Sequence, residues 1–218
     1  MKLRFSKQRD RAFSFYEILV VISVLGFLAL FLLPRIAQIN SKNGRIYCLM
    51  NLRQMGDAFL VWAGDHNTKF PMQISVANGG AMELATTGNV AACFIVMSNQ
   101  LSSPKVLICP TDIRHLAVTN FGKDFDNSHI SYFVALDAIP NSSQRFVSGD
   151  DNFATNDTRV KSCVLDVTTN MSIAWIRSRH PYGGNLDYSD GHAQETQNSD
   201  LPIALQQTGL ATNRLAIP

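Results

Sequence analysis

The chain has 218 residues, a formal net charge of +2 and 46% hydrophobic residues. This length suffices for one globular domain and one further segment, but not for two independent cores. The positive charge is concentrated in the first twelve residues, which hold five basic residues and one acidic residue, whereas the remainder is slightly acidic. Nucleic-acid-binding proteins carry a basic face on the folded part, so DNA and RNA are not expected as partners. The four cysteines form no C-x-x-C pair, which argues against a zinc ribbon or a thioredoxin-like motif.

An apolar segment follows the basic start of the chain. Every residue from 18 to 33 is apolar or small, and the run ends at Pro34. Extended back to Phe13, the segment reaches the roughly 20 residues of a transmembrane helix, but it then includes Glu17. A carboxylate in such a helix calls for a partner, because charge is costly there. We therefore predict a transmembrane helix over residues 13–34, with the basic start of the chain in the cytoplasm.

Two interpretations of the role of this segment are open from its residues alone. A cleaved secretory signal would place a small-residue cleavage site after the apolar run, where the sequence instead reads FLLPRI. A plain signal anchor explains the helix and its orientation, but it leaves Glu17 without a role.

The next segment, residues 35–66, has the periodicity of an amphipathic helix. We expect the helix to continue to about Asp65 and to pack its apolar stripe on the rest of the protein. The stripe consists of Ile36, Ile39, Ile46, Leu49, Leu52, Met55, Phe59 and Trp62.

Residues 67–218 contain short apolar runs between turn residues. The run at 91–97 suits a short helix, and those at 106–109, 130–136 and 171–176 suit strands. The predicted fold class is therefore α+β, with a long N-terminal helix packed on an antiparallel β-sheet head.

The start of the apolar segment resembles a known processing motif. Residues 11–22, RAFSFYEILVVI, are similar to the cleavage and methylation motif of type IV prepilins. The resemblance implies that a prepilin peptidase cuts between Ala12 and Phe13 and that Phe13 is then N-methylated. It also implies that Glu17 sets the register of assembly and that Pro34 breaks the helix. Ala12 departs from the family, which nearly always has glycine before the cut.

The head carries a second resemblance to pilin-like proteins. His180, nine intervening residues and Asp190-Gly191 are similar to the H-x9-DG signature of a large group of these proteins. Asp190-Gly191 also suits a tight hairpin turn. Three further segments match blocks of the same group in the same order, namely Cys48 with Asn51–Gly56, Cys109–Asp112, and Ser131-Tyr132.

Together these resemblances imply a structural subunit, not an enzyme, of a type IV pilus or a type II secretion pseudopilus. The implied organisation is a cytoplasmic leader (1–12), a transmembrane and assembly helix (13–34), its amphipathic continuation (35–66) and a globular pilin-like head (67–218). The implied partners are prepilin peptidase, other pilin or pseudopilin subunits and the inner-membrane assembly machinery. The implied location is the bacterial inner membrane, with a periplasmic head, and then the filament. The alternative is a membrane-anchored binding or enzymatic module that uses the segment only as an anchor.

Cys48 and Cys109 lie in the two cysteine blocks that carry the resemblance, and we predict that they form a disulfide. The alternative is that both are free, buried apolar residues.

No cofactor is expected, although Asp187 and Asp190 are candidates for calcium ligands, because some related pseudopilins bind calcium in a C-terminal loop. Their spacing misses the usual calcium-loop pattern by one residue. Asp150, Asp151 and Asp157 form a further acidic loop. A hydrolase triad of Ser178, His180 and Asp190 lacks the motif that such enzymes carry around the nucleophile.

Overall fold

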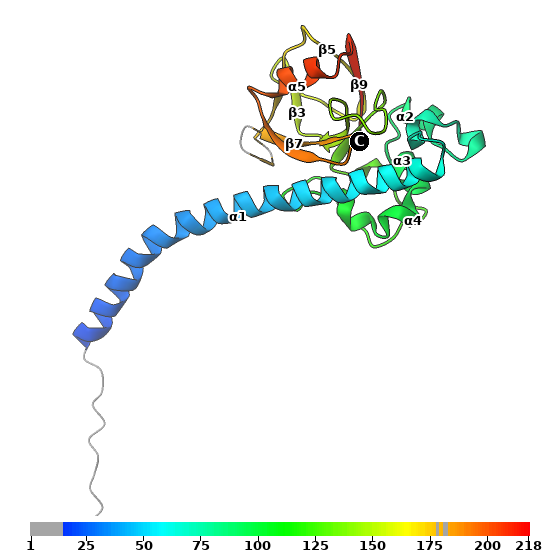
Figure 1. Cartoon of the computed structure of the whole chain (residues 1–218). Helices are drawn as coiled ribbons and strands as arrows, with labels where there is room; N and C mark the ends of the chain where they lie inside the picture. Colours follow the sequence, from blue (N-terminus) through cyan, green and yellow to red (C-terminus); the bar gives the residue numbers. More distant parts are fainter. Residues whose placement is uncertain (1–14, 178, 181–182) are drawn as a thin grey trace, which may run out of the picture. The chain divides into compact units, whose positions relative to one another are not determined.

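The computed structural model describes residues 15–177, 179–180 and 183–218 (Figure 1). The chain divides into two compact units, Met1–Asn40 and Ser41–Pro218. The long helix α1 (Phe15–Asp65) provides the described part of the first unit and enters the second. The predicted extent of this helix, to about Asp65, is confirmed.

The described residues contain no helix with both the length and the apolar character needed to cross a membrane. The prediction of a transmembrane helix over residues 13–34, and with it that of a single-pass inner-membrane protein, is therefore wrong. The physical reason is visible in the sequence. The uninterrupted apolar run covers only residues 18–33, which is shorter than the roughly 20 residues that a bilayer requires.

Helix α1 also passes through Pro34 without interruption, so no melted turn is present at this residue, and a kink there stays a prediction. A proline removes one backbone hydrogen bond, and a long helix can lose that bond and remain helical on both sides.

In the second unit, one face of α1 enters the core. Cys48, Leu52, Met55, Phe59 and Trp62 recur at alternating intervals of four and three residues and are all at most 2% exposed. This spacing places them on one side of the helix. The predicted stripe is therefore right from Leu52 onward, whereas Ile46 is 49% exposed.

Short helical segments follow α1. The predicted helix at 91–97 is confirmed as α3. The predicted strand at 106–109 is wrong, because residues 104–107 form the 3-10 helix η3. Ser103 caps this helix by accepting a hydrogen bond from the Lys105 amide (3.4 Å), and Pro104 suits its first position. The segments are η1 (Pro71–Gln73), η2 (Val76–Asn78), α2 (Met82–Ala85), α3 (Ala91–Val96), α4 (Ser98–Leu101), η3 (Pro104–Leu107), η4 (Asn127–His129) and α5 (Leu201–Gln207).

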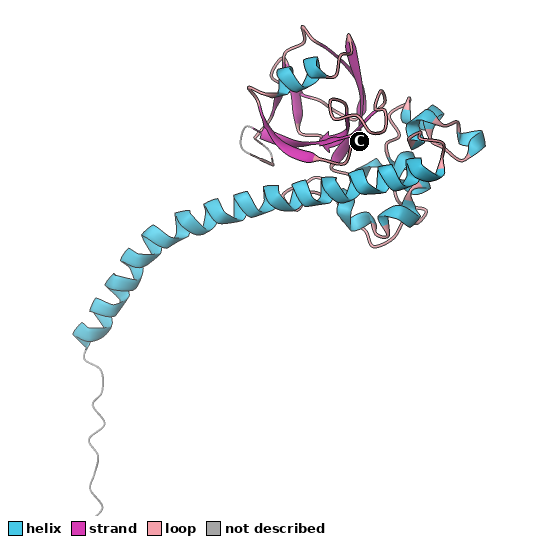
Figure 2. Cartoon of the chain, in the orientation of Figure 1, coloured by secondary structure: helices cyan, strands magenta, loops and turns pink. Residues whose placement is uncertain are grey.

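The strands form two antiparallel sheets, coloured magenta in Figure 2. The larger has the order β5-β9-β1-β2-β7-β8 and the smaller the order β4-β3-β6. The strands predicted at 130–136 and 171–176 are confirmed as β1 and β6, and the α+β class is confirmed with them. The strands are β1 (Tyr132–Ala135), β2 (Phe146–Asp150), β3 (Phe153–Thr155), β4 (Thr158–Arg159), β5 (Cys163–Thr168), β6 (Ile173–Trp175), β7 (Gly183–Tyr188), β8 (Ala193–Gln197) and β9 (Thr212–Ile217).

A disulfide joins Cys48 on α1 to Cys109, with the Cα atoms 5.2 Å apart, as predicted. The two cysteines are 61 residues apart in the sequence. Closing a loop of that size restricts the unfolded chain and stabilises the fold by about 4 kcal/mol. The other two cysteines, Cys93 and Cys163, are free.

Helix α1 approaches strand β7 closely at Gly56. A Cβ atom at this position would lie 2.6 Å from both carboxylate oxygens of Asp187, which is fully buried. Gly64, two turns further along the same helix, has open space around the corresponding position. The absence of a side chain at Gly56 therefore allows the helix and the sheet to pack together.

We predict that Gly56→Ala lowers the free energy of unfolding by about 1–3 kcal/mol, because the added methyl group overpacks a buried contact. Gly64→Ala is the matched control and should raise that free energy by up to about 1 kcal/mol through helix propensity alone. Urea denaturation of both variants measures the difference. Equal stabilisation by the two substitutions would show that Asp187 moves aside freely and would contradict the packing argument.

Candidate functional site

The predicted processing site lies outside the described residues, which begin after Ala12 and Phe13. Glu17 is described and lies in the first turn of α1. An acidic side chain at this end of a helix is stabilised by the helix dipole. Glu17 therefore has a local structural role in addition to the assembly role that the resemblance implies.

The first unit exposes an apolar helix surface. The five consecutive residues Ile18, Leu19, Val20, Val21 and Ile22 are 48–63% exposed. Because an α-helix has 3.6 residues per turn, five consecutive residues cover its whole circumference. This part of the helix is therefore apolar on every side, a pattern that is typical of helices buried in a larger structure.

In the head, His180 of the predicted signature is fully buried beside the disulfide. Its Nε2 atom lies 3.6 Å from Cys109 Sγ and 3.8 Å from Asp150 Oδ2. Burial, helped by the nearby charge of Arg45, lowers the pKa of His180 to about 4. The imidazole is therefore neutral at neutral pH.

The other end of the signature lies in a different environment. Asp190 and Gly191 form the predicted turn between β7 and β8, and Gly191 has the positive φ of 91° that a glycine adopts readily. Asp190 Oδ1 lies 2.5 Å from His192 Nδ1 and accepts a hydrogen bond from the His192 amide. The carboxylate that faces His180 is that of Asp150, so the hydrolase triad with Asp190 is not supported, and Ser178 lies outside the described residues.

The sequence interpretation missed a buried ion cluster that is centred on Arg179. Arg179 is only 6% exposed, and its guanidinium group pairs with Asp112 at 2.9 Å and with Asp151. Its Nη1 atom donates to the carbonyl oxygen of Ser131 at 2.6 Å and lies 3.7 Å from Asp150 Oδ1. In the sequence, the cluster is indicated by the position of Arg179 beside His180 and by the two adjacent aspartates at 150 and 151.

The aspartates in this cluster differ in how strongly they hold their charge. Burial alone would raise the pKa of Asp112, but the hydrogen bond from His115 and the charge of Arg179 hold it well below its usual value. Burial raises the pKa of Asp150 to about 6, although Arg179 opposes this shift. Of these two aspartates, Asp112 therefore holds its charge beside the buried arginine more strongly than Asp150 does.

Asp187, a candidate calcium ligand, is buried with neither carboxylate oxygen hydrogen-bonded to another described residue. Burial, together with the charges of Asp57 and Asp190, raises its pKa well above the usual value. Calcium coordination by Asp187 and Asp190 stays a prediction. The third residue of the acidic loop, Asp157, is exposed, whereas Asp150 and Asp151 are buried with Arg179.

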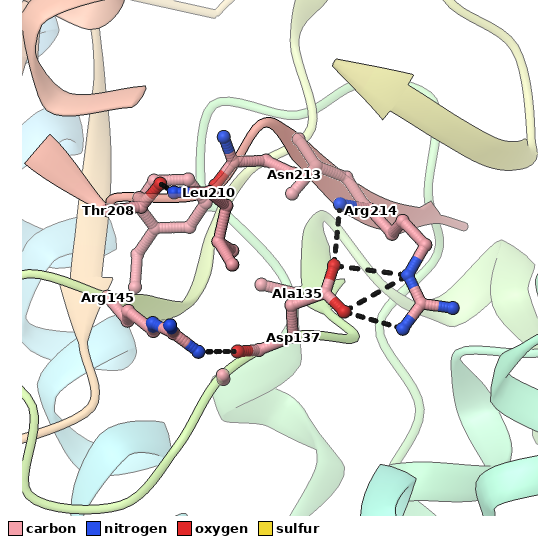
Figure 3. Close-up of a pocket in the computed structure, with 10 residues that line it drawn as sticks. Ala135, Asp137, Arg145, Thr208, Leu210, Asn213 and Arg214 are labelled. Carbon is pink, nitrogen blue, oxygen red and sulfur yellow. Dashed lines mark hydrogen bonds and ion pairs between the residues drawn. The ribbon is translucent and has the colours of Figure 1, made fainter. Parts of the chain in front are cut away.

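A small cavity lies between β1 and β9, and Figure 3 shows its lining. Asp137 is one of the residues that line the cavity. Its carboxylate pairs with Arg214 Nη2 at 2.5 Å, and its carbonyl oxygen accepts a hydrogen bond from Arg145. The cavity measures about 10 Å³, which is about the space for one water molecule. A wider hollow of about 430 Å³ opens nearby at the surface and shares Asp137, Arg145, Leu210 and Arg214 with it.

No family model matches the chain, and neither a curated protein nor a solved structure is significantly similar to it.

We predict that Asp187→Asn stabilises the protein increasingly as the pH rises from about 4. The unfolded chain releases this proton near pH 4, whereas the folded protein retains it to a much higher pH. Folding therefore takes up a proton in that range, and the wild type loses stability as the pH rises through it. Free energies of unfolding of both proteins, measured at several pH values from 4 to about 8, test this. A difference that stays constant with pH would contradict the buried, protonated state.

Proposed function

We propose that the protein is the structural subunit of a filament, either a type IV pilus or a type II secretion pseudopilus. In this proposal prepilin peptidase removes residues 1–12 and the subunits assemble through their N-terminal helices. The observation that carries the proposal is the apolar surface of α1 from Ile18 to Ile22, which is exposed on all sides.

This surface favours a bundle over a simple pair of helices. One neighbouring helix contacts only one stripe of its partner, as in the narrow seam of a two-stranded coiled coil. A helix that is apolar around its circumference needs several neighbours to remove it from water. A filament core built from many copies of the same helix provides such neighbours, and it needs no bilayer to do so.

Glu17 suits the same arrangement. The resemblance to prepilins implies that the new amino group of Phe13 on one subunit meets Glu17 on another. Inside an apolar helix bundle, each of these charges would be unfavourable alone and acceptable as a pair. Subunits out of register would separate these two charges, so the pair selects one axial position.

The first experiment tests processing. Co-expressed with prepilin peptidase, the wild type should yield a mature chain that begins with N-methyl-Phe13, which mass spectrometry of the N-terminal peptide detects. Ala12→Gly should be processed at least as well, because glycine is the residue the family has before the cut. Ala12→Leu should retain residues 1–12, since the site requires a small residue. An unchanged mature N-terminus in Ala12→Leu would rule out the assigned cleavage site.

The second experiment tests assembly. Glu17→Gln keeps the size of the side chain and removes its charge, so the mutant should be processed normally but be lost from sheared and sedimented filaments. Breaking a buried ion pair typically costs about 3–5 kcal/mol, enough to reduce incorporation by at least about a hundredfold. Glu195→Gln is the matched control, because that side chain lies on the head and is 48% exposed. Recovery of both variants at wild-type levels would refute the role of Glu17.

A further inference from the structure

Four side chains of the types that bind metals converge in the core of the second unit. Cys48, Cys109, Asp150 and His180 each offer one ligand atom, and these atoms all lie within 4.8 Å of one another. All four residues are buried. They come from α1, the segment after η3, the end of β2 and the loop before β7, so the fold alone brings them together.

We propose that these four residues bind one Zn²⁺ ion when the Cys48–Cys109 disulfide is reduced. The disulfide and the metal are then alternative cross-links at one place in the fold. The disulfide fastens α1 to the segment that carries Cys109, and the metal would fasten it to the segments that carry Asp150 and His180 as well.

The present geometry is close to that of a tetrahedral zinc site. With Zn–S near 2.3 Å and Zn–N near 2.0–2.1 Å, a sulfur and a nitrogen ligand lie about 3.6 Å apart. Cys109 Sγ and His180 Nε2 are separated by 3.6 Å. A nitrogen and an oxygen ligand would be about 3.4 Å apart, and His180 Nε2 and Asp150 Oδ2 are separated by 3.8 Å. The main adjustment is at the sulfur atoms, which separate to about 3.8 Å in such a site once their bond is broken.

The charges of the four ligands also suit a zinc ion. Two thiolates, one carboxylate and Zn²⁺ leave a single net negative charge. Arg179 lies beside it, with Nη1 3.7 Å from Asp150 Oδ1. Two sulfur ligands and one imidazole favour zinc over calcium or magnesium, which prefer oxygen ligands.

The reaction needs a reductant, and a water-soluble tertiary phosphine supplies it. The phosphine attacks one sulfur atom, and water then completes the step, so that one disulfide, one phosphine and one water give two thiols and one phosphine oxide. Zinc next displaces the two thiol protons, which pass to the buffer. A phosphine suits this experiment because it is not itself a thiol and offers zinc no thiolate ligand.

The full-length chain is tested with Zn²⁺ in competition with a chromogenic zinc chelator, before and after phosphine treatment. The reduced protein should bind one equivalent of zinc per chain, and the oxidised protein should bind none at this site. With Co²⁺ as a spectroscopic substitute, the reduced protein should show thiolate-to-metal charge transfer and the absorption pattern of a tetrahedral site.

Substitutions assign the ligands. His180→Ala should weaken zinc binding by the reduced protein by at least about tenfold. Cys163→Ser and Cys93→Ala, which alter the two free cysteines, should leave the affinity unchanged. Near-ultraviolet circular dichroism monitors folding throughout. If reduction alone loosens the fold of the wild type, zinc should restore its native spectrum.

Three results would overturn the proposal. The first is equal zinc binding by the oxidised and reduced proteins. The second is loss of zinc binding in the Cys163 or Cys93 variant while His180→Ala still binds zinc. The third is a reduced protein that neither binds zinc nor refolds in its presence.

Discussion

The buried guanidinium group of Arg179 constrains much of the second unit. A cation at 6% exposure is tolerated only where anions and hydrogen-bond acceptors surround it, so the segments that carry them must converge. Asp112 lies three residues after the disulfide-bonded Cys109, and Ser131 precedes β1. Asp150 ends β2, and Asp151 follows it. One side chain thus links the disulfide to the centre of the larger sheet. The same arrangement places the neighbouring residue, His180, against Cys109 Sγ.

Two buried aspartates show how partners, more than burial, decide the charge of a carboxylate. Asp112 receives a hydrogen bond from His115 and an ion pair from Arg179, and its pKa is lowered. Asp187 has no hydrogen-bonded partner among the described residues and lies near two further acids, so its pKa is raised. A neutral Asp187 can lie against the α1 backbone at Gly56, where an unpaired charge would be very costly.

The sequence predicted the features that depend on local periodicity or on a recognisable block. These include the end of α1, its buried stripe from Leu52, strands β1 and β6, the turn at Gly191 and the Cys48–Cys109 bridge. The strand predicted at 106–109 was wrong, because Ser103 caps a 3-10 helix there and Pro104 suits its first position. The prediction also failed for the membrane, because it extended a run of 16 apolar residues past Glu17. The Arg179 cluster could not be predicted, since its members lie up to 67 residues apart in the sequence and only the sheet order brings them together.

The apolar residues of helix α1 lie in two different environments along its length. From Cys48 to Trp62 one apolar stripe, which recurs every three or four residues, is buried by the head of the same chain. From Ile18 to Ile22 the apolar residues occupy every side and remain exposed. The residues of the first pattern are buried within one molecule, and the Cys48–Cys109 disulfide attaches this part of the helix to the head covalently. The proposed assembly would bury the second pattern, and because no stripe of this segment is polar, neighbouring helices would have to surround it. This difference between the two parts of one helix is what favours a many-subunit assembly over a monomer or a two-helix dimer.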